Sequence, residues 1–319
     1  MVFIPLYYTR RNDCMKEKKI SKKMWPYLFA LPFIVAYLLF NLFPVIYSFY
    51  MSLHEWNGVG DATFVGIANY TRIFTRDKLF WKSVGNTFLI MAFATPISVI
   101  GGLVLAYLLF NLKKGKRLFQ TISFFPYITT PVAIGFIFAY LFDYSGGYIN
   151  QFLLTTGLME DKFHWLNTVW TSRAIVILMI IWRNLGYFMT IYLAGMTAIS
   201  SDVYEAAQID GAGRLQSFLK ITIPLLRNTS IFLGLTSVIG GLQLFDEPYQ
   251  LFAGWGSGAV NVGGPSYSVL TTIWKFFDDS FKSNSMLGYG AAVSFSLFVL
   301  IFIVSMLQLK MTDRKEIES

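Results

Sequence analysis

Polar side chains that could bind a polar solute form a stripe inside one long apolar stretch. Arg183, Tyr187 and Thr190 are spaced i, i+4 and i+7, which puts them on one side of a helix, and Asn184 lies beside them. Polar residues inside a membrane are costly, so they are default candidates for a transport pathway. Amide groups can hydrogen-bond a polar solute, and tyrosine rings offer flat apolar faces. Arg183 also has a structural interpretation, as the partner of an acidic residue within the membrane.

A second polar cluster lies near the end of a later apolar stretch. Gln243, Asp246, Glu247 and Gln250 fall on one helical face, and Pro248 should disturb the helix there. Amide and carboxylate oxygens accept hydrogen bonds from hydroxyl groups. The alternative, which applies most to Glu247 and Gln250, is that these side chains reach outward to the lipid headgroups.

The composition is that of a membrane protein. Of 319 residues, 55% are hydrophobic and 14% are charged, whereas soluble domains carry about 25% charged residues. The net charge of +8 does not indicate nucleic-acid binding, because the basic residues lie between apolar stretches. The single cysteine, Cys14, excludes an internal disulfide, and His54 and His164 lack metal-ligand spacing. We therefore predict no catalytic and no metal site, and the absence of a G-x-x-x-x-G-K-[ST] motif predicts no ATP site in this chain.

Six apolar stretches, each about 20 residues or longer, predict an all-α polytopic membrane protein with six transmembrane helices. Pro32 and Pro44 interrupt the first stretch, and Pro126 and Pro131 should kink the third. A basic arm, residues 1–24, precedes the membrane domain 25–309, and a charged tail, 310–319, follows it. The external loop 54–84 should carry short interfacial helices. The predicted spans are 25–51, 85–112, 118–142, 171–197, 224–249 and 286–309.

The distribution of basic residues predicts the orientation of these spans. The segments proposed to be inside carry 17 Lys and Arg, and those proposed to be outside carry 8. Cytoplasmic loops are enriched in these residues. Both termini and the 204–224 loop are therefore expected in the cytoplasm.

The loop at 204–224 is a polar segment between two spans. Ser201 or Asp202 could cap a first short helix, and Gly211 and Gly213 allow a bend after it. A second short helix should cover 215–222. Pro224 would then begin the next membrane helix, where a missing N–H costs least. For an isolated segment of this kind, an ordinary solvated loop is the alternative.

The spacing within this loop resembles the "EAA" signature of the permease subunits of ABC importers. In that family the loop docks into a groove on a cytoplasmic ATPase and transmits its motion. The resemblance implies that Glu205 is the charged anchor and that Gly211 makes the turn that shapes the docking surface. The residues implied in coupling are Glu205, Ala206, Ala207, Asp210, Gly211, Ala212, Phe218 and Pro224.

Other stretches resemble the sugar-importing branch of these permeases, so the resemblance extends from Trp25 onward. W-R-N-L-G-Y (182–187) and L-Q-L-F-D-E-P-Y (242–249) resemble the regions that line the sugar site in oligosaccharide importers. The run N-V-G-G-P-S (261–266) resembles an external segment on the side that receives the substrate-binding protein, although a plain turn is an equal interpretation. The pathway residues implied are Arg183, Asn184, Tyr187, Gln243, Asp246 and Glu247.

The resemblance also implies the other members of the machine. This chain would bind no cofactor, since ATP and Mg²⁺ belong to a cytoplasmic ATPase dimer. A second permease subunit, an extracytoplasmic solute-binding protein and the lipid of the bacterial inner membrane complete the set. Three alternatives remain open: an importer of glycerol phosphate or another polar solute, with Arg183 as a phosphate partner; an ion-driven carrier or channel; and a scaffold or sensor without transport.

Overall fold

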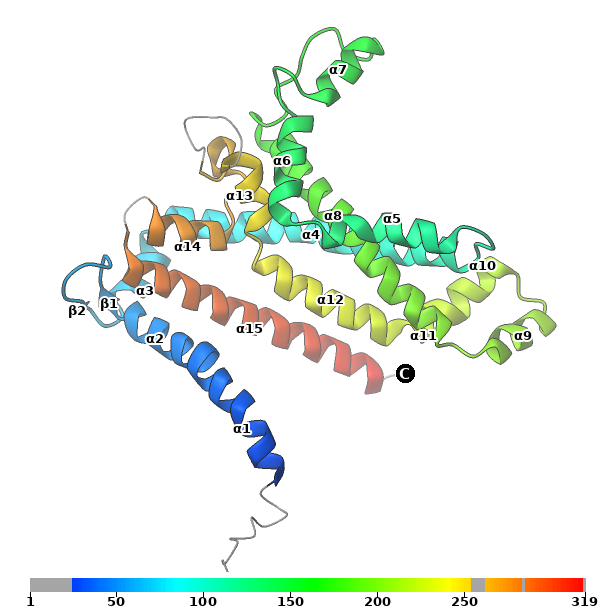
Figure 1. The fold of residues 1–319 in the computed structure, drawn as a ribbon, viewed down its shortest axis with the longest axis horizontal. Coiled ribbons are helices and arrows are strands. Elements are labelled where there is room, and N and C mark those ends of the chain that lie inside the picture. Colours follow the sequence, from blue (N-terminus) through cyan, green and yellow to red (C-terminus); the bar gives the residue numbers. More distant parts are fainter. Residues whose placement is uncertain (1–24, 254–261, 283–284, 318–319) are drawn as a thin grey trace, which may run out of the picture. The chain divides into compact units, whose positions relative to one another are not determined.

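The computed structural model describes residues 25–253, 262–282 and 285–317 of the chain (Figure 1). The chain divides into two compact units, Met1–Ser48 and Phe49–Ser319. The predicted basic arm, residues 1–24, and Asn261 of the N-V-G-G-P-S run lie outside the described residues.

The N-terminal unit is a helical segment with one widened turn. Helix α1 (Trp25–Tyr37) passes into a π-helical turn (Leu38–Leu42) and then into α2 (Phe43–Ser52). Pro32 lies inside α1, so the predicted interruption there is wrong. Pro44 follows the π turn by two residues, and a wider turn relieves the clash between a proline ring and the preceding turn. Residues Tyr27–Ser52 are long and apolar enough to cross a membrane.

The second unit contains the other candidate spans. Helices α4 (Lys78–Phe110), α8 (Val169–Thr197) and α15 (Leu287–Ile317) are single long helices. Helix α5 (Lys116–Ile128) and α6 (Pro131–Leu141) form a pair bent by 95°, and the helix from Arg214 to Leu225 is bent by 63° against α12 (Arg227–Leu242). If each bent pair counts as one span, the described residues hold up to six spans by length and composition. This agrees with the predicted all-α, six-helix architecture.

Several element boundaries differ from the prediction. Helix α4 begins at Lys78 rather than near 85, because the Asp77 carboxylate caps it by accepting a hydrogen bond from the Phe80 amide at 3.0 Å. The expected charged tail is helical as far as Ile317. The predicted external loop, residues 54–84, contains one short helix, α3 (Ala68–Thr75), a small antiparallel pair, β1 (His54–Glu55) and β2 (Thr63–Phe64), and the first turns of α4.

The second unit is organised around the pair α4 and α8. Helix α5 packs on α8, α12 packs on α4 and α15, and α13 (Asp246–Ala253) packs on α6 (Figure 1). Short elements lie in the connections between the long helices: α7 (Tyr148–Thr155), a 3₁₀ turn (Pro265–Tyr267) and α14 (Thr272–Phe281). Helices α5 and α8 meet backbone to backbone, since a Cβ atom on Gly186 would lie 1.9 Å from the Ser123 carbonyl oxygen. The fold therefore fixes α5 and α8 as neighbours.

The segment 262–271 is hydrogen-bonded to α4 and α8. The Asn86 side chain donates hydrogen bonds to the carbonyl oxygens of Tyr267 at 2.7 Å and Leu270 at 3.1 Å. Its amide oxygen accepts a hydrogen bond from Arg173 of α8 at 2.9 Å, and Arg173 also donates to the Ser268 carbonyl at 3.0 Å. Buried Asn86 thus joins two long helices and the segment through one amide group.

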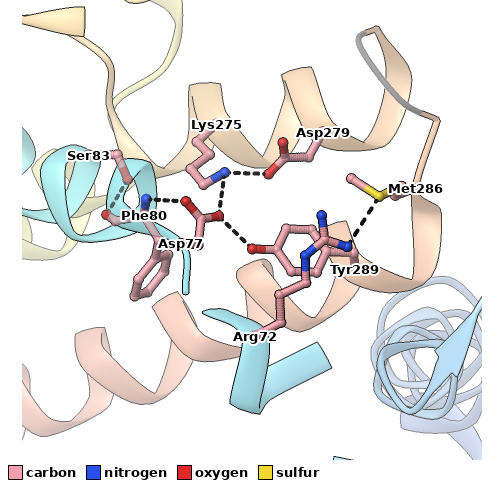
Figure 2. A network of polar contacts seen from close by, with 8 residues as sticks. All are labelled: Arg72, Asp77, Phe80, Ser83, Lys275, Asp279, Met286 and Tyr289. Carbon is pink, nitrogen blue, oxygen red and sulfur yellow. Dashed lines mark hydrogen bonds and ion pairs between the residues drawn. The ribbon is translucent and has the colours of Figure 1, made fainter. Parts of the chain in front are cut away.

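A buried polar network fixes α14 and α15 to the start of α4 (Figure 2). The Lys275 ammonium lies 2.8 Å from the carboxylates of both Asp77 and Asp279, and the Tyr289 hydroxyl donates to Asp77. Burial raises the pKa of Asp77, but hydrogen bonds from Lys275 and Tyr289 more than offset it, and the pKa lies below the ordinary value. Burial raises the pKa of Asp279, and the Lys275 ammonium offsets only part of that rise. The folded state therefore favours a charged Asp77 and disfavours a charged Asp279.

Candidate functional site

A cavity of about 420 Å³ lies among α4, α5, α8, α12 and the segment 243–247. All of the predicted pathway residues line it. They come from two stretches that are about 60 residues apart in the chain, and the fold brings these stretches together at the cavity. Two neighbours in the predicted stripes do not. The Thr190 hydroxyl bonds back to the Gly186 carbonyl at 2.8 Å, and Gln250 packs against Gly135 of α6. The pathway residues at the cavity are Arg183, Asn184, Tyr187, Gln243, Asp246 and Glu247.

An ion pair crosses one wall of the cavity. The guanidinium of Arg183 on α8 donates to the carboxylate of Glu247 on α13. Glu247 is only 5% exposed, so the interpretation in which it reaches out to the headgroups is wrong. The Arg183 side chain is 24% exposed, and its Nε atom is buried without a hydrogen-bond partner among the described residues. Arg183 thus has an acidic partner, as its structural interpretation expected, and also faces the cavity.

The helix carrying the second cluster breaks earlier than predicted. Helix α12 ends at Leu242, Gln243 follows as its C-cap, and α13 begins at Asp246. Pro248 does not disturb a continuous helix; it lies in the first turn of α13, where a missing N–H is tolerated. The break exposes Gln243 and Asp246 to the cavity, while Glu247 turns inward to Arg183.

Aromatic side chains form another part of the wall. Tyr127 of α5 stacks on Tyr187 of α8, with ring centroids 4.6 Å apart and ring planes 16° from parallel. Sequence reasoning missed Tyr127, because it lies in a different predicted span and belongs to no polar stripe. Its position directly after Pro126 was the available signal, since a proline in a span marks an irregularity that often lines a cavity.

Hydroxyl groups on α4 were also missed. Thr95 and Ser98 line the cavity, and their side-chain oxygens are buried with no hydrogen-bond partner among the described residues. Buried polar atoms usually have partners, so these oxygens have unused capacity for water or a ligand. The spacing T-P-I-S at 95–98, a polar pair beside a proline inside an apolar span, was the signal in the sequence.

The side chains at this cavity carry the polar and aromatic groups that could contact a polar solute. Hydroxyl, amide and carboxylate groups can exchange hydrogen bonds with a polyhydroxylated molecule, and the stacked tyrosines offer an apolar face. Within 25–253, 262–282 and 285–317, no group of three or more His, Cys, Asp or Glu side chains could hold a metal ion.

The predicted coupling loop folds as a helix and a tight turn. Helix α9 (Ser201–Ile209) is capped by Ser200, one residue before the predicted caps, through a hydrogen bond from the Asp202 amide at 3.3 Å. At its other end, the Ala212 amide bonds to the Ala207 carbonyl at 2.8 Å, and Gly211 has φ +80°. This is a Schellman cap, in which glycine takes the left-handed position. Gly211 therefore does form the predicted turn.

The second part of the loop differs from the prediction. Helix α10 (Arg214–Ser217), a π turn (Phe218–Thr222) and α11 (Ile223–Leu225) form one helical run, which bends at Leu226 into α12. Pro224 therefore ends the loop's own helix and does not begin the membrane helix. The π turn lies just before Pro224, as the other π turn lies just before Pro44. In both places the wider turn relieves the clash between the proline ring and the preceding turn.

The predicted coupling residues divide into exposed and buried groups. Glu205, Ala206, Asp210, Gly211 and Pro224 are exposed, whereas Ala207 and Phe218 are buried. The Phe218 ring packs on Tyr107 of α4 with centroids 4.1 Å apart, so it holds the loop to the membrane domain.

The loop also shapes a groove and presents apolar side chains. A groove of about 620 Å³, to which Glu205, Ala212 and Phe218 contribute, lies between α9, α10 and the ends of α4 and α8. Ile209 is 86% exposed and Leu215 is 63% exposed, so apolar side chains remain uncovered beside the turn.

The loop and the cavity are linked by the two helices on either side of the loop. Helix α8 carries Arg183, Asn184 and Tyr187 and leads into α9. Helix α12 begins where the loop ends and reaches the cavity with its last turn, about 24 Å along its axis. The loop is therefore continuous in the chain with two helices that line the cavity.

Comparison with known proteins assigns this architecture to a family. The family model of the binding-protein-dependent transport system inner membrane component matches residues 98–315. The arabinooligosaccharides transport system permease protein AraP of Bacillus subtilis is 32% identical over 97% of this chain and 95% of its own length. The lactose transport system permease protein LacF of Rhizobium radiobacter is 33% identical over 88% of this chain and 92% of its own length.

A solved structure has the same fold. A chain of a bacterial ABC transporter involved in the import of the acidic polysaccharide alginate superposes with a TM-score of 0.79 at 22% identity, covering 92% of this chain and 96% of that one. The family match covers residues 98–315, which include most of the long helices and both bent pairs. This chain belongs to the family of binding-protein-dependent transport system inner membrane components.

Proposed function

We propose that this chain is the permease subunit of an ATP-driven importer of di- or oligosaccharides. It forms half of the pathway, a second permease subunit forms the other half, and a separate ATPase dimer hydrolyses ATP. An extracytoplasmic solute-binding protein delivers the sugar, and both termini lie in the cytoplasm of a bacterial cell. The relatives named for arabinooligosaccharides and lactose support this substrate class.

The cavity is the observation that carries the proposal. Its wall combines a stacked tyrosine pair with amides, carboxylates and unpartnered hydroxyls, the groups that suit a sugar's apolar face and its hydroxyls. A volume of about 420 Å³ suits a saccharide, since ligand pockets measure about 300–1,000 Å³.

The loop of α9 to α11 supports coupling to a cytoplasmic ATPase. Exposed Ile209 and Leu215 give it an uncovered apolar surface, which is typical of a protein contact. ATP binding would close the ATPase pair and move the loop, and α8 and α12 would carry that movement to the cavity. The cavity would then open outward to receive sugar, and hydrolysis would reset the inward-facing state.

Two substitutions in the loop test the coupling, each with a matched control. Glu205→Lys reverses an exposed charge on α9. Glu160→Lys makes the same change on the segment 143–168, which the proposed orientation places outside the cell. Gly211→Asp and Gly157→Asp both place a side chain at a glycine of positive φ, +80° and +69°, with no atom within 4 Å. The two glycine variants therefore carry similar backbone strain and differ in position.

The assay is uptake of radiolabelled lactose and arabino-oligosaccharides by a strain lacking the chromosomal gene, together with co-purification of the ATPase. The loop variants should lose uptake and ATPase association while reaching the membrane at normal levels, and the controls should retain both. Normal transport by both loop variants would contradict the coupling role. If deletion of the gene affects uptake of no saccharide, the proposed substrate class is wrong.

A further inference from the structure

The cavity has an uneven set of charges. Of the described residues that line it, one is cationic, Arg183, and two are anionic, Asp246 and Glu247, which leaves a net formal charge of −1. Arginine is always protonated in proteins. Its charge is matched by Glu247 in the ion pair, whereas Asp246 is exposed and pairs with no described residue.

The features that could attract an anion are covered by the chain's own carboxylates. The first is Arg183, whose guanidinium is engaged by Glu247. The second is the N-terminus of α13, where helix N–H groups favour negative charge, but its first turn already contains Asp246 and Glu247. An incoming carboxylate, sulfonate or phosphate would meet one unpaired carboxylate and no available cation. Hydroxyl groups would still find acceptors there.

We infer that this cavity selects for neutral saccharides against acidic ones, and that Glu247 sets this selectivity by neutralising Arg183. The assignment of saccharides as the substrate rests on the proposed function, whereas the preference for neutral over anionic solutes does not. An importer of glycerol phosphate with Arg183 as the phosphate partner is disfavoured for the same reason.

The charge preference can be measured without knowing the sugar. Cys14 is the chain's single cysteine, so Cys14→Ser gives a background in which one new thiol can be followed. Gln243→Cys places a thiol at an exposed position of the cavity. Thr156→Cys places a thiol at an exposed position of the segment 143–168, which does not line the cavity. In the complete transporter, the rates of modification by cationic 2-(trimethylammonium)ethyl and anionic 2-sulfonatoethyl methanethiosulfonate are followed by mass spectrometry of this chain.

The cavity thiol should favour the cationic reagent, relative to the ratio of the two rates at position 156. Adding Glu247→Gln should lower that preference by about fivefold, because one lost unit charge acts in opposite senses on the two reagents. Asp246→Asn should lower it to a similar extent, and this variant keeps the ion pair. The double variant Arg183→Gln, Glu247→Gln keeps the net charge of −1 and should stay close to the parent.

If the ratio of cationic to anionic reaction rates in the parent cavity is equal to or below the ratio at position 156, the charge preference is refuted. An unchanged ratio in Glu247→Gln would overturn the role of Glu247, and if that variant does not assemble, Asp246→Asn still tests the sign of the field. Uptake then tests the substrate, with neutral and uronic oligosaccharides of the same length supplied to the complete system. Uptake of the uronic series would refute the inference and leave the proposed function intact. Uptake of neither series would refute the proposed function, and the thiol ratio would still decide the charge preference.

Discussion

Replacing Gly186 by alanine should separate α5 from α8 and damage the tyrosine wall of the cavity. The added Cβ would lie 1.9 Å from the Ser123 carbonyl oxygen, 2.5 Å from its carbonyl carbon and 2.8 Å from the Phe124 Cα. All three are backbone atoms, so no side chain can turn away to make room. Tyr127, one helical turn after Ser123, would move with α5 and leave its stacked position on Tyr187.

The structure sets the size of this effect. An ordinary contact begins near 3.4 Å, so the two backbones must separate by 1.5 Å, the difference between 3.4 and 1.9 Å. Overpacking of this kind costs about 1–3 kcal/mol or more. Alanine recovers about 1 kcal/mol through its higher helix propensity. Gly85→Ala is the matched control, because Gly85 lies inside α4 with no atom within 4 Å of its added Cβ and should only gain.

The assay compares apparent melting temperature in detergent and sugar uptake for the two variants. Gly186→Ala should melt below the parent and transport poorly, whereas Gly85→Ala should melt at or above the parent. The helix-propensity gain is common to both variants and cancels, so the predicted difference between them is the overpacking cost, about 1–3 kcal/mol. Equal melting temperatures and normal uptake in both would show that α5 and α8 are not in backbone contact.

Three further predictions concern buried polar groups outside the cavity. At pH 7, Asp77→Asn should lower the melting temperature more than Asp279→Asn does. The lowered pKa of Asp77 contributes stability above pH 3.8 that is lost as pH falls through the folded pKa, whereas the raised pKa of Asp279 opposes its ionisation. The reverse order of melting temperatures would contradict this. Asn86→Leu should destabilise the protein by about 1–3 kcal/mol, since buried carbonyls lose their donor, and unaltered protease resistance of the 262–271 segment would count against it. Asn150→Ala should expose the 143–168 segment to limited proteolysis, because Asn150 bonds to Phe163 and Trp165, and an unchanged digestion pattern would show that these bonds do not hold the segment.

The sequence predicted the cavity residues because their chemistry contradicts their surroundings. Arg183 and Asp246 are conspicuous in apolar stretches, and helical spacing places Tyr187 one turn from Arg183. Glu247 was found for the same reason, but its burial against Arg183 depends on α13 folding back beside α8. That contact is tertiary, and no local pattern encodes it.

The missed features have physical causes as well. Tyr127 enters the cavity because α5 meets α8 at Gly186, a contact between spans that spacing within one span cannot predict. The helix break fell at Gln243 rather than at Pro248, since Gly240 and Gly241 weaken the end of α12 and a proline is accommodated best in the first turn of a new helix. In both cases the local signal was present, but its consequence depended on a partner elsewhere in the chain.

The hydrogen bonds between Asn86 and Arg173 connect the segment 262–271 to one end of α8. Arg173 lies in the first turns of α8, and the same continuous helix, about 43 Å long, leads to α9 at its opposite end. Under the proposed function, a solute-binding protein that contacts the segment 262–271 and an ATPase that contacts α9 would thus act on opposite ends of one continuous helix. Linkage requires equal free energies in both directions, so a solute-binding protein that favours one state of the ATPase must itself be gripped more tightly when the ATPase adopts that state.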